Sequence, residues 1–191
     1  MSEHYLVAYA SRAGSTAEAA EAIGEVLRES GAEVDVHSVD EVHGLAGYDA
    51  LVLSSAIWAG KPLPEALRFA TAHQQVLATL PVAYFALCEI LRVDTPANRD
   101  RAHSFLDPLR EIQQPAALEA FAGKKDYSSV HPLVRWLMIH VLHSPEGDWR
   151  DWDKIRAWAA DLPPRFARAA RVRAPSSPSV VRRLAGAGGR H

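Results

Sequence analysis

The sequence predicts an α/β protein in which helices cover both faces of a parallel β-sheet. Residues 5–9 and 50–53 are short apolar runs, and the second is followed by Ser54, which is typical of parallel strands buried on both faces. Such segments alternate along the chain with longer ones whose apolar residues recur at helical spacing. Alternating strands and helices favour a parallel sheet with right-handed crossovers.

Five segments are predicted as strands. Residues 33–38 alternate between polar and apolar side chains, whereas the others are short apolar runs. In chain order the predicted strands are 5–9, 33–38, 50–54, 81–86 and 117–121.

Four segments are predicted as helices. Gly31 is expected to end the first helix, and Asp151 to cap the start of the last. Pro163 and Pro164 are expected to break or end that last helix. The predicted helices cover residues 16–30, 64–77, 96–109 and 151–170.

The charge is divided unevenly along the chain of 191 residues, which has a formal net charge of −2. Residues 165–191 contain seven arginines and no acidic residue. Because this segment is rich in Ser, Pro, Gly and Ala, we expect a basic, disordered tail. Residues 1–164 are expected to form one domain, with an insert at 124–150 that contains an amphipathic helix.

The single cysteine, Cys88, excludes an internal disulfide, and no signal peptide or spanning segment is visible, so a cytoplasmic location is expected. The run 131–143 carries apolar residues on one face. It is expected either to contact a membrane peripherally, together with the basic tail, or to pack on its own domain. Its histidines lack further ligands at suitable spacing, so no metal is predicted. No specific nucleic acid partner is expected.

Hydroxyl side chains gather in residues 11–16, between the first strand and the first helix. Unpaired backbone amides at a helix start bind anions, so this loop predicts a phosphate site. A Walker loop needs a lysine that is absent here, and a dinucleotide site needs three glycines where this loop has only Gly14. A single phosphate is therefore predicted. The alternative is an ordinary helix cap made by Ser15 or Thr16.

The loop Ser-Arg-Ala-Gly-Ser-Thr resembles the phosphate loop of the flavodoxin family, Thr/Ser-x-Thr-Gly-x-Thr. The resemblance implies a three-layer flavodoxin-like fold, a five-stranded parallel sheet of order 2-1-3-4-5, and FMN as cofactor. It implies that the phosphate is held by Ser11, Arg12, Ala13, Gly14, Ser15 and Thr16.

A second loop, residues 54–60, resembles the flavodoxin loop that packs against the isoalloxazine ring. Trp58 is the expected stacking residue; the alternative is a surface tryptophan that covers the sheet edge. Catalytic residues are not assigned. The residues implied for the ring pocket are Ala56, Ile57, Trp58, Ala59, Gly60, Leu87, Cys88, Gly123, Lys124, Asp126 and Tyr127.

Within the family, the chain resembles the menaquinone-dependent protoporphyrinogen dehydrogenases. The shared features are Arg12, the Ala-Ile-x-x-Gly loop at 56–60, Gly123 followed by Tyr127, and the insert 124–150. The resemblance implies an FMN-dependent oxidoreductase acting on a porphyrinogen with a quinone as acceptor. Two alternatives stay open: a flavodoxin-type electron carrier for redox protein partners, and a diverged module that binds flavin or deazaflavin.

Overall fold

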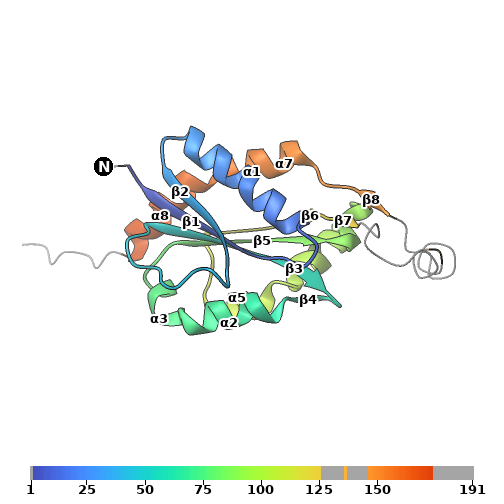
Figure 1. Ribbon diagram of the computed structural model, residues 1–191, viewed down its shortest axis with the longest axis horizontal. Coiled ribbons are helices and arrows are strands. Elements are labelled where there is room, and N and C mark those ends of the chain that lie inside the picture. The colour runs from blue at the N-terminus through green and yellow to red at the C-terminus, as the bar shows by residue number, and fades with distance from the viewer. Residues whose placement is uncertain (1, 126–135, 137–145, 174–191) are drawn as a thin grey trace, which may run out of the picture.

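The computed structural model describes residues 2–125, 136 and 146–173, which form three layers with a sheet in the middle (Figure 1). The predicted amphipathic run 131–143, apart from Trp136, and residues 174–191 lie outside the described residues. Among the described residues, no helix is long and apolar enough to cross a membrane.

The central sheet has five parallel strands in the order β2-β1-β3-β5-β6, so that β1 lies between β2 and β3. This is the order that the family resemblance implied. The strands are β1 (His4–Ala10), β2 (Glu33–Ser38), β3 (Ala50–Trp58), β5 (Val82–Cys88) and β6 (Ala117–Ala122).

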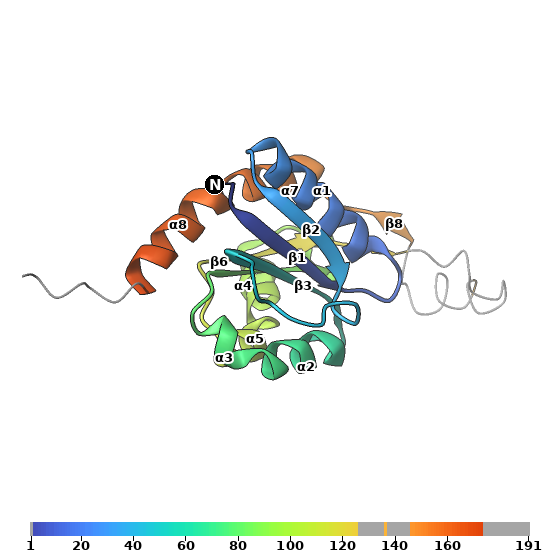
Figure 2. The same ribbon diagram turned by 60° about the vertical axis from the view of Figure 1, so that its left-hand side comes forward.

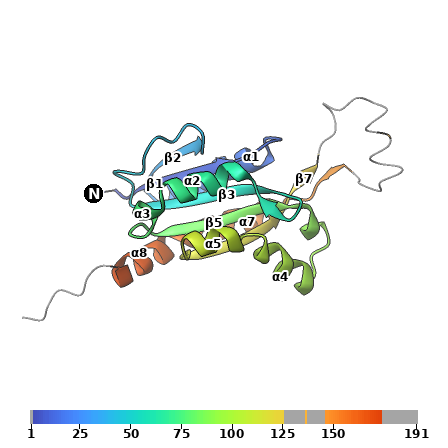
Figure 3. The same ribbon diagram turned by 90° about the horizontal axis from the view of Figure 1, so that it is seen from below.

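Helices cover both faces of the sheet, as predicted. Figure 2 shows α1 (Ser15–Glu29) and α7 (Trp152–Ala160) on one face. Seen from below in Figure 3, the opposite face carries α2 (Pro64–Ala72), α3 (Gln74–Leu77), α4 (Pro96–Ser104) and α5 (Asp107–Ile112).

Neighbouring residues of each buried strand belong to two different hydrophobic cores, one on each face of the sheet. Val7 packs with Ile23 of α1 and Ile155 of α7, whereas Leu6 packs with Phe69 of α2 on the other face. Successive strand side chains point to opposite faces, so a strand that is apolar at every position is needed between two helical layers.

Three short strands were not predicted. β4 (Lys61–Pro62) pairs antiparallel with the end of β3, and β7 (Lys124–Lys125) pairs antiparallel with β8 (Gly147–Asp148). Two-residue strands carry no periodic pattern, so their pairing is decided by the surrounding structure. A short 3-10 helix, η1 (Glu89–Arg92), follows β5.

The predicted helix over 96–109 was wrong as one element, because the chain forms α4 and then α5. Pro108 lies in the first turn of α5, where a missing N–H is tolerated but where it cannot continue a preceding helix.

The predicted helix over 151–170 forms as two helices, α7 and α8 (Leu162–Arg173). Residues 165–173, which were also expected to belong to the basic tail, are helical in α8. Pro163 and Pro164 fall in its first turn and are compatible with helix there. Phe166 is buried, and its ring lies 5.4 Å from that of Tyr5, so apolar packing holds the helix on the sheet.

Candidate functional site

The predicted phosphate loop joins the carboxyl end of β1 to the start of α1. Gly14 precedes the helix with φ of +83°, a left-handed conformation that glycine adopts without strain. Its N–H donates to Ser11 Oγ at 3.1 Å, which fixes the turn. No described atom lies within 4 Å of the position that a Cβ of residue 14 would take, so the loop faces open space there.

Thr16, at the start of α1, carries a buried polar group without a partner in the part of the chain that the structure describes. Its side chain is fully buried in the first turn of α1, and Oγ1 has no hydrogen-bond partner among the described residues. Burying an unpaired hydroxyl is costly, and the adjacent helix-start amides also lack intrahelical acceptors. No side chain caps α1, so the helix-cap alternative is not what the structure shows. The donor set fits a phosphate.

The remaining residues of the loop at 11–16, called the phosphate cradle from here on, lie at the surface. Arg12 and Ala13 are exposed, and Ser15 is half-buried as the first residue of α1. The Arg12 guanidinium carbon lies 5.9 Å from the centre of the Trp58 ring. This contact brings the phosphate loop and the predicted ring loop side by side, as the parallel pairing of β1 with β3 requires.

The predicted ring loop is a tight hairpin between β3 and β4. Ala59 and Gly60 have φ of +51° and +76°, and the two positive values are those of a type I′ turn. Trp58, just before the turn, is 68% exposed and therefore presents a large aromatic surface to solvent. An aromatic face in the open is suited to stacking with a planar ring.

The end of β3 is anchored below this turn. The buried Ser55 hydroxyl accepts a hydrogen bond from Leu63 N at 2.8 Å, which fixes the start of α2 against the strand. Ala56 is partly buried against the core under α2 and α5, and Ile57 against that core and the smaller cluster around Cys88. The exposed tryptophan is thus carried by a rigid strand end.

The third part of the predicted site lies at the ends of β5 and β6. Leu87 and Cys88 are almost fully buried, and Gly123 N donates to Cys88 O at 3.2 Å. The Cys88 thiol contacts Phe121 O at 3.7 Å, and burial raises its pKa to about 12. The thiol therefore stays protonated and acts as an apolar wall.

Lys124 points toward α1, where its Nζ lies 3.9 Å from Glu18 Oε1. The structure thus brings the loops after β1 and β3 together and places the ends of β5 and β6 beside each other. Asp126 and Tyr127, also predicted for the ring pocket, lie outside the described residues.

A pocket of about 680 Å³ lies along the edge strand β6, and no sequence pattern indicated it. Its apolar lining includes Phe121, Trp149 and Trp158. Arg92, from η1, lies over the Trp149 ring at 5.6 Å from its centre. The lining comes from five separate segments, so only the folded chain assembles it. Its volume is in the range of small-molecule sites.

The strand order, the phosphate loop and the exposed aromatic define a flavodoxin-like α/β protein. The sequence profile described as the flavodoxin domain matches residues 6–151. The chain belongs to this family, whose members bind FMN. No curated protein matches the chain.

Solved structures show the same fold. Oxidised flavodoxin 1 from Bacillus cereus is 18% identical, with a TM-score of 0.56 over 87% of this chain and 98% of that one. A short-chain flavodoxin associated with a non-canonical PDU bacterial microcompartment is 14% identical, with a TM-score of 0.52 over 88% and 99%. The flavodiiron protein from Giardia intestinalis is 13% identical, with a TM-score of 0.54 over 90% of this chain and 38% of that one.

Within residues 2–125, 136 and 146–173, no group of three or more His, Cys, Asp or Glu side chains is placed to hold a metal ion. A contact that sequence reasoning missed is made by Arg150, whose guanidinium reaches the start of α1 from a position 135 residues away. No local pattern signals a contact of that kind.

Proposed function

We propose that this chain binds FMN noncovalently and is a flavin-dependent oxidoreductase. The observation that carries the proposal is the buried, unpaired hydroxyl of Thr16 in a loop that opens on space at Gly14. A flavodoxin domain with this cradle has a phosphate-binding donor set where the family binds its cofactor. Bound FMN would supply the electron or hydride transfer, which the side chains themselves cannot perform.

In this proposal each loop has its own task. The amides of the loop, with Ser15 and Thr16, hold the phosphate, and Arg12 contributes positive charge beside it. Trp58 provides an aromatic wall for the isoalloxazine ring, and Cys88 a small apolar one. The protein thus binds and orients the flavin and excludes water from one side.

The same proposal extends to the substrate: a porphyrinogen, oxidised with a quinone as acceptor. It rests on the residue resemblance and on the pocket beside β6. That pocket joins aromatic side chains to Arg92 and also contains the carboxylates of Asp94, Glu119 and Asp151. The aromatic side chains suit a flat, apolar molecule. Peripheral membrane contact through residues 131–143 and the basic C-terminal residues stays a prediction.

The first experiment is the visible spectrum of the purified protein, with mass spectrometry of whatever is released on denaturation. We expect a flavin spectrum and released FMN. A colourless protein that takes up no added FMN in titration calorimetry would overturn the cofactor assignment.

The substrate is tested by incubating the flavin-loaded protein with protoporphyrinogen and a menaquinone analogue under anaerobic conditions. We expect protoporphyrin fluorescence that depends on protein and quinone and falls in Trp149→Ala, which removes pocket lining. Fluorescence no faster than without protein would contradict the substrate assignment.

The second candidate function is a flavodoxin-type electron carrier. It is favoured by the acidic residues of the chain, because 23 Asp and Glu stand against 14 Lys and Arg before residue 165. Acidic surfaces attract basic redox partners. Fast, salt-sensitive electron exchange with a flavodoxin reductase, without porphyrinogen turnover, would favour this function.

A further inference from the structure

We propose that Arg150 is a positioning residue for the ligand phosphate, acting through the first turn of α1 without touching the ligand. It orders the start of that helix and cancels an acidic charge beside the phosphate cradle. The inference rests on the proposed function, because it assigns to a residue outside the loop a role in holding the FMN phosphate.

The guanidinium contacts two groups of the first turn of α1. Arg150 Nη1 donates to Ser15 O at 3.3 Å and lies 2.7 Å from Glu18 Oε2. The Arg150 side chain is only 3% exposed, whereas the Glu18 side chain is 50% exposed. The hydrogen bond to Ser15 O is therefore the more sheltered contact, and hydrogen bonds from a charged donor are stronger than neutral ones. The start of α1, which presents the amides and Thr16 to the phosphate, is therefore held from outside the loop.

Arg150 is itself held in place from the other side. Asp148, in β8, accepts hydrogen bonds from Nε at 2.8 Å and from Nη2 at 2.6 Å. The guanidinium carbon also lies 4.5 Å from the centre of the Trp152 ring. Asp148 raises the pKa of Arg150, so the guanidinium stays charged. These partners fix the Arg150 side chain in place between β8 and the start of α1.

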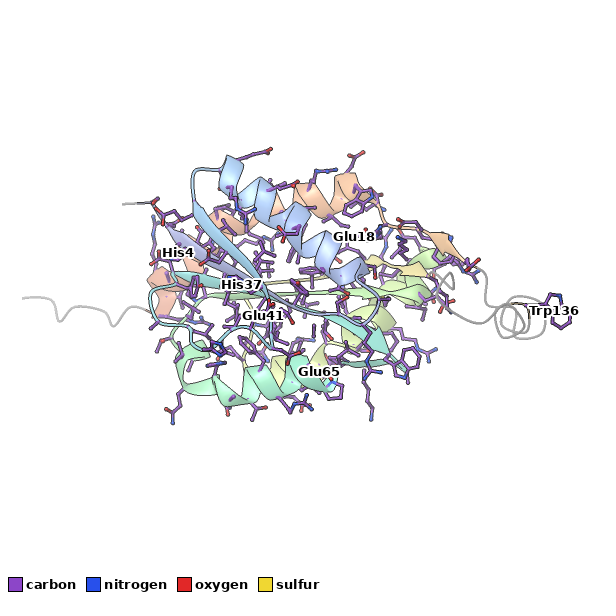
Figure 4. All side chains as sticks on the ribbon, viewed as in Figure 1. His4, Glu18, His37, Glu41, Glu65 and Trp136 are labelled. Carbon is purple, nitrogen blue, oxygen red and sulfur yellow. The ribbon has the colours of Figure 1, made fainter. Side chains whose placement is uncertain are left out.

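Arg150 also neutralises the negative charge of Glu18. Glu18 lies near the N-terminal end of α1 (Figure 4), in the turn where the phosphate cradle is formed. An unpaired carboxylate there would repel a dianionic phosphate, since charges within a Debye length of about 10 Å act on each other. Arg150, two residues after β8, pairs with this carboxylate at 2.7 Å, and Lys124, in β7, lies 3.9 Å from it.

The test compares FMN with riboflavin, which has the same ring but no phosphate. Dissociation constants of both flavins are measured by fluorescence quenching for the wild type and Arg150→Gln. We expect the affinity for FMN to fall about tenfold or more, and that for riboflavin to change less than about twofold. Arg156→Gln is the matched control, because Arg156 is exposed and contacts the same Trp152 ring at 5.9 Å; it should change neither affinity.

Two further variants separate the two effects. Adding Glu18→Gln to Arg150→Gln should recover about threefold or more of the lost FMN affinity, because the unpaired carboxylate is then gone. Arg150→Lys keeps the charge but loses the fork of donors, and should weaken FMN by less than Arg150→Gln. It also provides the test if Arg150→Gln fails to fold, which circular dichroism of the flavin-free protein shows.

Equal losses of FMN and riboflavin affinity, or no loss of either, would overturn this inference while leaving the proposed function intact. A wild-type chain that binds neither flavin would overturn the proposed function and this inference with it.

Discussion

Thr16 illustrates how one side chain can be poor for the stability of a fold and good for binding. Its hydroxyl is buried without a partner among the described residues, an arrangement that lowers the stability of the ligand-free protein. Native proteins retain few such groups, and those retained are often functional. In the proposed function, a bound phosphate would accept the hydrogen bond of this hydroxyl.

Thr16→Val is expected to act in opposite directions on stability and binding. Valine has the same shape without the hydroxyl, so the free energy of unfolding without flavin should stay equal or rise by up to about 1 kcal/mol. The affinity for FMN should fall about tenfold. Urea denaturation and flavin titration measure the two effects. Thr71→Val, at an exposed position of α2, is the control for binding; unchanged FMN affinity in Thr16→Val would contradict the role given to this hydroxyl.

At the scale of elements, the hairpin between β3 and β4 carries the exposed tryptophan on a strained turn. Ala59 occupies a left-handed conformation that an L side chain adopts only at a cost of about 1 kcal/mol. Gly60 meets the second positive φ without strain, and a Cβ there would lie 3.3 Å from the Phe105 ring. The turn geometry is thus satisfied at one position and strained at the other.

Ala59→Gly is expected to raise the free energy of unfolding by about 0.5–1 kcal/mol, because glycine relieves the strain. Gly60→Ala should lower it, through the same strain and the close approach to Phe105. Chemical denaturation of both variants measures the difference. Stabilisation by Gly60→Ala would show that the turn is not of this type.

Asp94 connects two helices across the sheet edge. It pairs with Arg99 of α4 at 2.5 Å and with Lys154 of α7 at 3.4 Å. The hydrogen bond from Arg99, followed by the nearby charges of Arg99 and Lys154, lowers the pKa of Asp94 to about 2. The paired carboxylate therefore keeps its charge well into acid.

The pH dependence of stability follows from that lowered pKa. Asp94 stabilises the fold above its unfolded pKa of about 3.9, and this stabilisation is lost as the pH falls toward 2. Thermal melts between pH 2 and 5 should show a smaller loss for Asp94→Asn than for the wild type. Since the pair is exposed, added salt should reduce the difference. Identical acid profiles for both proteins would refute the assignment.

At the scale of the whole molecule, α8 packs the segment from Leu162 to Arg173 onto the sheet. The helix carries several arginines and looks polar, but Leu162 and Phe166 are buried against the core on the α1 side of the sheet. Two apolar residues one turn apart are enough to dock a short helix on an existing core. Stability of the flavin-binding layer therefore depends on a C-terminal segment.

Phe166→Ala is expected to lower the free energy of unfolding by about 3 kcal/mol, the cost of emptying a buried aromatic site. Val172→Ala, in the same helix but at a side chain 81% exposed, should change it by less than about 0.5 kcal/mol. Both are measured by urea denaturation. Equal, small effects would place α8 outside the cooperative unit.

Patterns over neighbouring residues were sufficient to predict the layers of this protein. The strand over residues 33–38 has the bounds found in the structure, and Asp151 caps α7 by accepting from Lys154 N at 3.1 Å. The position of the loop at residues 11–16, between β1 and α1, was equally predictable, because a strand end, a glycine and a helix start are all local features. Its binding of a phosphate stays a prediction. The family resemblance then added the strand order.

Local patterns were enough to predict the sheet, its helical layers and the loop at residues 11–16, because burial and helix starts leave a signal in neighbouring residues. The pairing of groups that are distant along the chain depends instead on the folded structure. The β7–β8 pair, the pocket along β6, the docking of α8 and the contact of Arg150 with Ser15 O depend on segments far apart in sequence. Such contacts form because folding brings those segments together, and the local pattern of one segment does not predict which distant segment it will contact.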